Sequence, residues 1–312
     1  MNFYTNTKSR AFFGHNMLIF EISLPNFLIF IIMICESVCN NQNSKLAKKL
    51  IFQGSSNGIG RETAKIFVKE GAKVTITGRS QSALEETKKL CLEAGAKPDD
   101  ILELIGDITC EVFNEQLIAT TVEKFGRLDV LVNNAGGGTF KAMGTPILEM
   151  PLNDFDKMID LNVKPVLRLS KLAAPHLEKT KGAIINVSSI AAHFRFNGMP
   201  FYAASKSALD QITVQLAGSL IKSGIRVNSV NPGPVLTNFV ATCGATLEQQ
   251  AKMYESMTAN PAVPLGRIGM PADIGQVILF LADRSKSEIL VGQIITADGG
   301  SMLQRPVFFK VD

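Results

Sequence analysis

One stretch decides how this chain folds: Leu50-Ile-Phe-Gln-Gly-Ser-Ser-Asn-Gly-Ile-Gly60, which a helical pattern over residues 61–70 follows. The apolar residues 50–52 predict a short buried strand, and the closely spaced glycines predict a tight turn. A strand, a glycine-rich turn and a helix in this order let a pyrophosphate approach the backbone and the N–H groups of a helix N-terminus. The sequence therefore predicts a dinucleotide site on this turn, although a glycine pattern in isolation often marks a turn alone.

Strands and helices are expected to alternate along the rest of the chain. Further strand patterns lie at residues 73–77, 101–105, 128–132, 182–187, 225–230 and 293–296. The run at 182–187 is continuously apolar rather than alternating, which is typical of a parallel strand covered on both faces. The pattern predicts an α/β fold with one doubly wound, Rossmann-like parallel sheet of about seven strands in a single domain.

The composition excludes several classes of protein. Of the 312 residues 46% are hydrophobic and 19% are charged, so the chain can bury a sizeable core and is not disordered. The net charge is only +4, and no dense basic block carries interleaved aromatic residues, which argues against nucleic-acid binding. The five cysteines lack paired spacing and the three histidines are scattered. We therefore expect reduced thiols and no metal site.

Residues 1–44 do not resemble the rest of the chain and are expected to form a hydrophobic leader before a single α/β domain over residues 45–312. Their apolar part, residues 17–35, is interrupted by Glu21 and Pro25, and its longest unbroken run is too short to span a bilayer unaided. Three interpretations stay open: a signal peptide, a membrane anchor or a gene-model artefact. The expected location is intracellular, either cytoplasmic or membrane-associated, with membrane contact through residues 17–35.

A second informative stretch starts where the strand at 182–187 runs into Ser188 and Ser189. A loop follows, and then a helix carries Tyr202 and Lys206, whose spacing of about one turn puts both side chains on one face. A nearby ammonium favours the phenolate and lowers the pKa of a tyrosine, which would suit Tyr202 to proton transfer. The spacing alone also fits an ordinary amphipathic helix with a snorkelling lysine.

The form Gly-x-x-x-Gly-x-Gly at 54–60, together with Ser189, Tyr202 and Lys206, resembles the short-chain dehydrogenase/reductase family over residues 45–303. The resemblance implies hydride transfer between a nicotinamide dinucleotide and a secondary alcohol or carbonyl. It selects Ser189, thirteen residues before Tyr202, to position the substrate oxygen. Tyr202 is then the acid/base, and Lys206 binds the nicotinamide ribose and lowers the pKa of Tyr202.

The resemblance also gives a meaning to one asparagine and to one glutamine. Asn162 is implied as the fourth catalytic residue, which kinks its helix and holds a water between Lys206 and bulk solvent; a surface asparagine is the alternative. Gln53 is a departure, because the family commonly has threonine before the first glycine.

A set of cofactor contacts is implied as well. It comprises Gly54, Ser56, Asn57, Gly58, Ile59, Gly60, Asp107, Asn134, Gly136, Tyr202, Lys206, Pro232, Gly233, Val235 and Thr237. Within it, Asp107 would contact the adenine ring or, alternatively, cap a helix from Glu111 onward. Val235 and Thr237 would contact the nicotinamide carboxamide.

The end of the second strand indicates which dinucleotide is used. Enzymes that select NAD usually place an acidic residue there, and this chain has Gly78 and Arg79 instead. Arg79 can pair with a 2′-phosphate, which favours NADP while NAD stays possible. The alternative is that Arg79 is a surface residue at the start of the next helix with no role in cofactor binding.

Substrate and assembly complete the expectations. Residues 238–262 are interpreted as a substrate lid. The loop between Ser189 and Tyr202 carries mostly large apolar and aromatic side chains, which favours an apolar alcohol or ketone as the substrate. They are His193, Phe194, Phe196, Met199 and Phe201.

The family resemblance implies a homodimer or homotetramer built on helices at 161–179 and 202–222. The competing interpretations are a dinucleotide-binding sensor or scaffold without turnover, and a membrane-tethered structural protein.

Overall fold

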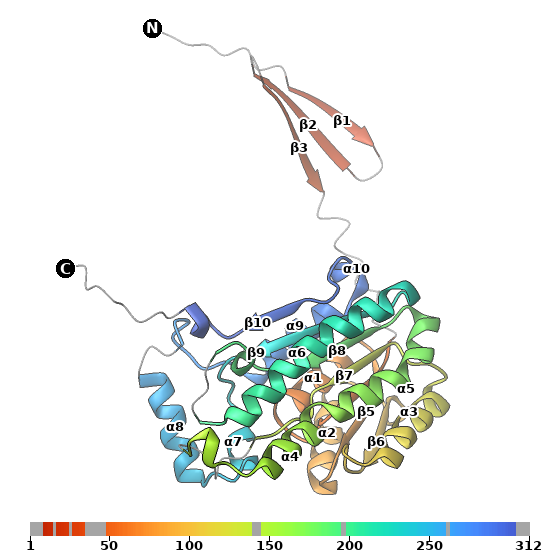
Figure 1. The fold of residues 1–312 in the computed structure, drawn as a ribbon. Helices are drawn as coiled ribbons and strands as arrows, with labels where there is room; N and C mark the ends of the chain where they lie inside the picture. The colour runs from red at the N-terminus through yellow and green to blue at the C-terminus, as the bar shows by residue number, and fades with distance from the viewer. Residues whose placement is uncertain are drawn as a thin grey trace, which may run out of the picture. The chain divides into compact units, whose positions relative to one another are not determined.

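The computed structural model describes residues 9–14, 17–24, 27–34, 48–138, 145–194, 198–259 and 263–303 (Figure 1). The chain divides into two compact units, Met1–Lys45 and Leu46–Asp312. In the first unit, three strands pair antiparallel in the order β1-β2-β3. Their bounds are β1 (Ser9–Gly14), β2 (Met17–Leu24) and β3 (Phe27–Ile34). Within these described ranges, no helix is long and apolar enough to cross a membrane.

The second unit is organised around a seven-stranded sheet in the order β10-β9-β8-β7-β4-β5-β6, with every neighbouring pair parallel. Its strands are β4 (Lys49–Gln53), β5 (Lys73–Gly78), β6 (Ile101–Ile105), β7 (Val130–Asn133), β8 (Ala183–Val187), β9 (Arg226–Pro232) and β10 (Ile294–Ala297). The order reverses between β4 and β7, and the carboxyl ends of strands at such a point form a ligand-binding crevice. This confirms the predicted doubly wound, Rossmann-like sheet.

Helices cover both faces of this sheet (Figure 1). They are α1 (Gly58–Lys69), α2 (Gln81–Glu93), α3 (Glu111–Phe125), α4 (Leu152–Asn162), α5 (Lys164–Thr180), α6 (Pro200–Leu220), α7 (Phe239–Thr242), α8 (Leu247–Ala259), α9 (Pro271–Ala282) and α10 (Arg284–Ser287). Side chains of α1, α2 and α9 form one buried cluster with the sheet. Side chains of α3, α5 and α6 form a second cluster with the sheet.

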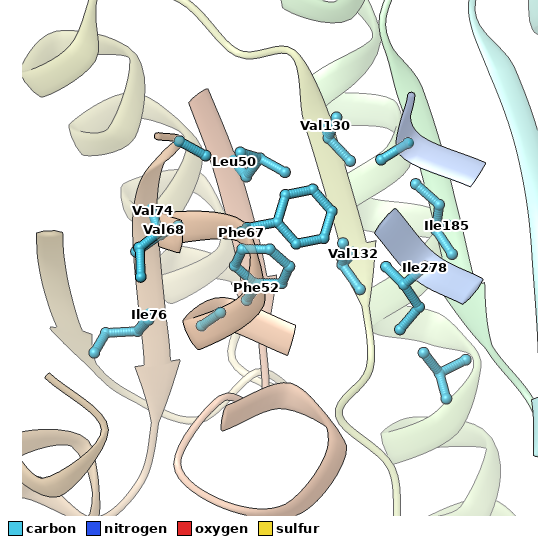
Figure 2. Close-up of a cluster of buried hydrophobic side chains, with 14 of the residues drawn as sticks. Leu50, Phe52, Phe67, Val68, Val74, Ile76, Val130, Val132, Ile185 and Ile278 are labelled. Carbon is cyan, nitrogen blue, oxygen red and sulfur yellow. The ribbon is translucent and has the colours of Figure 1, made fainter. Parts of the chain in front are cut away.

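The central strand β4 shows why the predicted strands are continuously apolar. Leu50 and Phe52 pack into the cluster with α1 and α9, whereas Ile51 packs into the other cluster. Figure 2 shows the first cluster, in which the rings of Phe52 and Phe67 meet edge to face with centroids 5.1 Å apart. Because both faces of the strand are buried, each of its positions favours an apolar residue.

Two local expectations differ from the structure. Helix α1 begins at Gly58, three residues before the predicted start, so Gly58 to Gly60 form its first turn. Asp107 does not cap the helix that begins at Glu111, because Cys110 holds that position. The Asp107 carboxylate instead accepts hydrogen bonds from the backbone N–H and the hydroxyl of Thr109, 2.9 and 2.8 Å away.

Candidate active site

The glycine turn between β4 and α1 requires glycine for steric reasons. Gly54 has φ +71°, a conformation that side chains rarely adopt, and a Cβ there would lie 2.7 Å from the Cα of Ala135. A Cβ on Gly60 would lie 2.3 Å from the carbonyl oxygen of Gly54. Asn57 is the extended N-cap residue, and its side chain makes no capping hydrogen bond to α1. The first turn of α1 therefore keeps backbone N–H groups for an anion, and it contains no acidic residue to repel one.

Asn134 and Gly136 follow β7 and lie on the floor of the site. The Asn134 amide donates to the carbonyl oxygens of Gly54 and Gln53, at 2.9 and 3.2 Å. Asn134 therefore holds the glycine turn in place. A Cβ on Gly136 would lie 3.0 Å from Asn162 Oδ1 and 3.1 Å from Lys206 Nζ, so glycine is what allows these groups to approach.

The carboxyl ends of β5 and β6 bring Arg79 and Asp107 together. Arg79 is exposed. Partial burial raises the pKa of Asp107, but hydrogen bonds from Thr109 and the charge of Arg79 lower it, and the net pKa lies below its usual value. A cation thus stands where an acidic residue would be expected to bind a ribose 2′-hydroxyl.

The turn after β9 carries the residues that were expected to meet the nicotinamide. A Cβ on Gly233 would lie 2.7 Å from the Cα of Asp298. Val235 forms a parallel bridge with Gly269, which anchors the turn. A Cβ on Gly58 would lie 3.2 Å from the Thr237 methyl group, so the two expected cofactor-binding turns face one another.

Ser189 and Tyr202 meet at the carboxyl end of β8. The Ser189 side chain hydrogen-bonds the Tyr202 phenol, and its Oγ also accepts from the N–H of Ala191 at 3.1 Å. The expected lowering of the tyrosine pKa is wrong for this arrangement. Burial raises the pKa of Tyr202 to about 12, the hydrogen bond from Ser189 lowers it, and Cys243 raises it further. Desolvation of the phenolate outweighs the nearby polar groups.

Lys206 lies beside Tyr202 on α6. Its Nζ is 5.8 Å from the centre of the Tyr202 ring and donates to the carbonyl oxygen of Val187 at 2.9 Å. The side chain is 3% exposed. Burial lowers the pKa of Lys206 to about 8, and the charge of Asp210 acts in the opposite direction.

Asn162 ends α4, and α5 starts two residues later, so the helix is broken where a kink was expected. Its amide is fully buried and held on both sides. Oδ1 accepts from the N–H of Gly137 at 3.0 Å, while Nδ2 lies within hydrogen-bond distance of the Gly137 carbonyl at 3.0 Å and Ser205 Oγ at 2.9 Å. A surface asparagine is therefore the wrong alternative.

Ser188 is oriented differently from Ser189. Its hydroxyl donates to the backbone carbonyl of Lys206 at 3.2 Å, and the residue is buried. This ties the end of β8 to α6.

An apolar cluster adjoins the Tyr202 ring. Its buried members are Met150, Met158, Ala191, Met199, Phe201 and Tyr202, with Phe155, Ala203 and Phe239 packed around them. Phe194 is exposed, and Phe196 lies outside the described residues. His193 does not join this cluster, because its ring contacts Asn231 and Asp210.

Sequence reasoning missed several residues at the site. Cys243, at the end of α7, accepts a hydrogen bond from the N–H of Gly138 at 3.2 Å and lies close enough to Tyr202 to raise its pKa. Asp210 and Tyr254 are the others, and only the Lys206-to-Asp210 spacing of one turn could have indicated either. Cys91, Cys110 and Cys243 are free thiols, and the described residues contain no cluster of potential metal ligands.

Known proteins with similar sequences belong to one class of enzyme, the reductases and dehydrogenases. A family model described as enoyl-(acyl carrier protein) reductase matches residues 54–302. The 3-oxoacyl-[acyl-carrier-protein] reductase FabG of Thermotoga maritima is 34% identical over 257 residues, which cover 82% of this chain and 98% of that protein.

Solved structures are also similar. A Caenorhabditis elegans short-chain dehydrogenase/reductase of unknown function, solved with cofactor, has a TM-score of 0.80 and 43% identity, covering 83% of this chain and 96% of its own. A 7α-hydroxysteroid dehydrogenase in complex with NADH and 7-oxo glycochenodeoxycholic acid has a TM-score of 0.73 and 33% identity, with coverage of 84% and 97%.

The fold, the glycine turn and these relatives define an oxidoreductase that transfers hydride with a dinucleotide. The chain belongs to the short-chain dehydrogenase/reductase family, which confirms the resemblance predicted from its residues.

Proposed function

We propose that this chain interconverts a secondary alcohol and a ketone of an apolar substrate, with NADP(H) preferred over NAD(H). The observation that carries the proposal is the Ser189–Tyr202 hydrogen bond beside the buried Lys206 ammonium, next to the glycine turn at the switch point of the sheet. When bound, a nicotinamide dinucleotide supplies or accepts the hydride. The side chains of this chain then have to orient the substrate oxygen and move a proton.

Each catalytic role follows from the surroundings of its residue. Because burial raises the pKa of Tyr202 to about 12, its phenol is protonated near neutral pH and can donate to the oxygen of a ketone being reduced. The Ser189 hydroxyl, already bonded to that phenol, holds the same substrate oxygen. Lys206 supplies positive charge that stabilises the phenolate left behind. Asn162, adjacent to Gly136 and near Lys206, serves the relay that returns a proton.

The residues around the crevice fit a dinucleotide. A Cβ at Gly54 or Gly60 would collide with backbone, and the first turn of α1 keeps its N–H groups for a pyrophosphate. Ser56, Ile59, Pro232 and Gly233 complete the walls of the proposed site. Arg79 is exposed at the end of β5, where it can reach a 2′-phosphate, and this supports the preference for NADP.

The walls beside Tyr202 support an apolar substrate. Met199, Phe201 and Phe239 belong to the same apolar cluster as Tyr202, and the Phe239 ring centroid is 5.5 Å from that of Tyr202. A scaffold without turnover is not favoured, because all four proposed catalytic residues are present and Ser189, Tyr202 and Lys206 lie side by side. For the proposed homodimer or homotetramer, Leu167 on α5 and Val214 on α6 offer exposed apolar side chains.

Tyr202→Phe tests the catalytic role. We expect reduction of 7-oxo bile acids and related apolar ketones with NADPH to fall by about 100-fold or more, because a general acid is lost. NADPH binding, measured by fluorescence, should persist. Ser189→Ala should also reduce turnover, whereas Ser219→Ala, at an exposed position of α6, is the control and should not. Turnover retained by Tyr202→Phe would refute the assignment of the acid/base.

Arg79→Asp tests the choice of cofactor. The ratio of kcat/KM with NADP to that with NAD should fall by at least about tenfold, since a charge-assisted hydrogen bond is replaced by repulsion. Lys89→Asp makes the same change of charge at an exposed site on α2 and should leave the ratio unchanged. Equal ratios in both variants would show that Arg79 does not select the cofactor.

A further inference from the structure

A buried carboxylate lies one helical turn beyond Lys206. Asp210 is 8% exposed, although aspartate is rarely buried without partners. Asn231 Nδ2 donates to its Oδ2 at 2.7 Å, while Ser229 Oγ lies 3.4 Å from its Oδ1 and only 2.8 Å from Asn231 Oδ1, to which it donates. His193 Nε2 lies 3.4 Å from Oδ2 and connects the carboxylate to the partly exposed surface of the loop. Donors from two other elements thus converge on a charge that would otherwise be costly to bury.

The same carboxylate joins three parts of the active site. Asn231 Nδ2, besides bonding Asp210, lies 3.1 Å from the carbonyl oxygen of Ser189. The Ser188 hydroxyl also interacts with Asp210 and donates to the carbonyl of Lys206. The end of β8, the catalytic turn of α6 and the end of β9 therefore meet at this one side chain.

The charged groups around Asp210 are few. Lys206 faces it from its own helix and His193 from the loop after β8, while β8 and β9 contribute only uncharged donors. Burial lowers the pKa of Lys206 to about 8, and Asp210 is the cause that raises it. Burial raises the pKa of Asp210, and its four polar or charged partners lower it. The attraction between the Asp210 carboxylate and the Lys206 ammonium therefore offsets part of the free-energy cost of desolvating both charges.

We propose that Asp210 is a positioning residue that keeps Lys206 charged and thereby sets the upper pH limit of turnover. The proposal rests on the proposed role of Lys206 at the active site. The proposed role is exercised through Lys206 and not on substrate or cofactor directly. The Asp210 carboxylate, held by Asn231 and Ser188, compensates an ammonium that has no carboxylate partner in hydrogen-bond contact among the described residues.

The direct test is the titration of Lys206 in the full chain, followed by NMR of lysines labelled with carbon-13 at Cε, with Lys206→Met to assign the signal. In Asp210→Asn the titration should move to lower pH than in the unchanged chain. His176→Gln, on α5, is the control and should leave it in place. An unmoved Lys206 titration in Asp210→Asn would overturn the proposal, whatever the activity of the protein.

Kinetics give the second readout. The alkaline limb of the kcat profile, measured with NADPH and a 7-oxo bile acid, should shift to lower pH in Asp210→Asn. Asp210→Glu keeps the charge and should keep the limb in place even where its bulk lowers kcat. If Glu shifts the limb as far as Asn does, charge is not the cause. Activity in Tyr202→Phe would refute the proposed function but would leave the Lys206 titration as an independent result.

Discussion

At the scale of single residues, a row of polar side chains crosses four neighbouring strands of the sheet, toward their carboxyl ends. Gln53, Asn133, Asn186 and Ser229 are opposite one another across β4, β7, β8 and β9. Asn133 donates to Asn186 at 2.9 Å, and Asn186 donates to Thr213 at 2.8 Å. Gln53 is fully buried, and among the described residues neither its Nε2 nor its Oε1 finds a partner. The residue that departs from the family pattern is therefore also the one whose polar group is least satisfied.

Gln53→Met should raise stability. Methionine has a similar shape and removes two buried polar atoms without partners, so the free energy of unfolding should increase by about 1–3 kcal/mol in chemical denaturation. Asn186→Met is the matched control on the same row. It leaves the Asn133 amide without its partner and should lower stability by a similar amount. A destabilised Gln53→Met would mean that the glutamine amide is satisfied in solution.

The candidate site shows what residue patterns can and cannot predict. The resemblance to the family selected Ser189, and a strand end and a helix face bring its side chain to the Tyr202 phenol. The direction of the Tyr202 pKa was predicted wrongly, since the spacing to Lys206 does not reveal how deeply the phenol is buried. Asp210 was missed because its partners come from β8, β9 and a loop, which are remote from it in sequence.

At the scale of elements, the predicted lid contacts the turn expected to bind the nicotinamide. The Tyr254 hydroxyl, on α8, donates to the carbonyl of Thr237 at 2.6 Å and lies 3.2 Å from its N–H, which donates to it. Gln250, one turn earlier, donates to the same carbonyl at 3.0 Å. Figure 1 shows α8 beside α7, the short helix that brings Phe239 and Cys243 to Tyr202. The predicted lid thus contacts the turn proposed to bind the cofactor and lies beside the helix that carries Phe239 to the apolar cluster at Tyr202.

Tyr254→Phe should loosen the lid. Loss of two hydrogen bonds, each contributing about 1 kcal/mol, should speed dissociation of NADPH by up to roughly thirtyfold. Stopped-flow displacement of NADPH, followed by its fluorescence, measures this rate. Lys252→Ala changes an exposed residue of the same helix and should have no effect. Unchanged dissociation in Tyr254→Phe would separate the lid from cofactor release.

Local chemistry marks some boundaries of the helices. Pro271 begins α9 and Ser80 caps α2, because proline and serine favour these positions. The start of α1 was predicted three residues late, since Gly58 and Gly60 are poor helix formers. In the structure both glycines are helical. Gly58 packs closely against Thr237 and Gly60 against Gly54, and these contacts favour glycine at both positions despite its low helix propensity.

At the scale of the whole molecule, every residue of the proposed site lies in the second unit, Leu46–Asp312. The alternation of strands and helices predicted that unit's sheet, because few connections fit a parallel topology. The apolar residues 17–35 were assigned to a signal peptide, an anchor or an artefact, and the structure has strands β2 and β3 there. Hydrophobicity without a clear period does not separate a strand pair from a short apolar helix.

Removal of residues 1–45 should leave the enzyme intact. The two core clusters that pack both faces of the seven-stranded sheet lie within 46–312, and so do the glycine turn and the Ser189–Tyr202–Lys206 arrangement. NADPH affinity and kcat/KM should therefore stay within about twofold of the full chain, as for changes outside a buried core. Removal of residues 1–52 is the control: it takes away β4, which pairs with both β5 and β7, and should abolish the cooperative thermal transition. If the protein without residues 1–45 also fails to fold or to bind NADPH, the first unit contributes to the folding or the cofactor binding of the second. The division into an independent sheet domain and a separate leader would then be wrong.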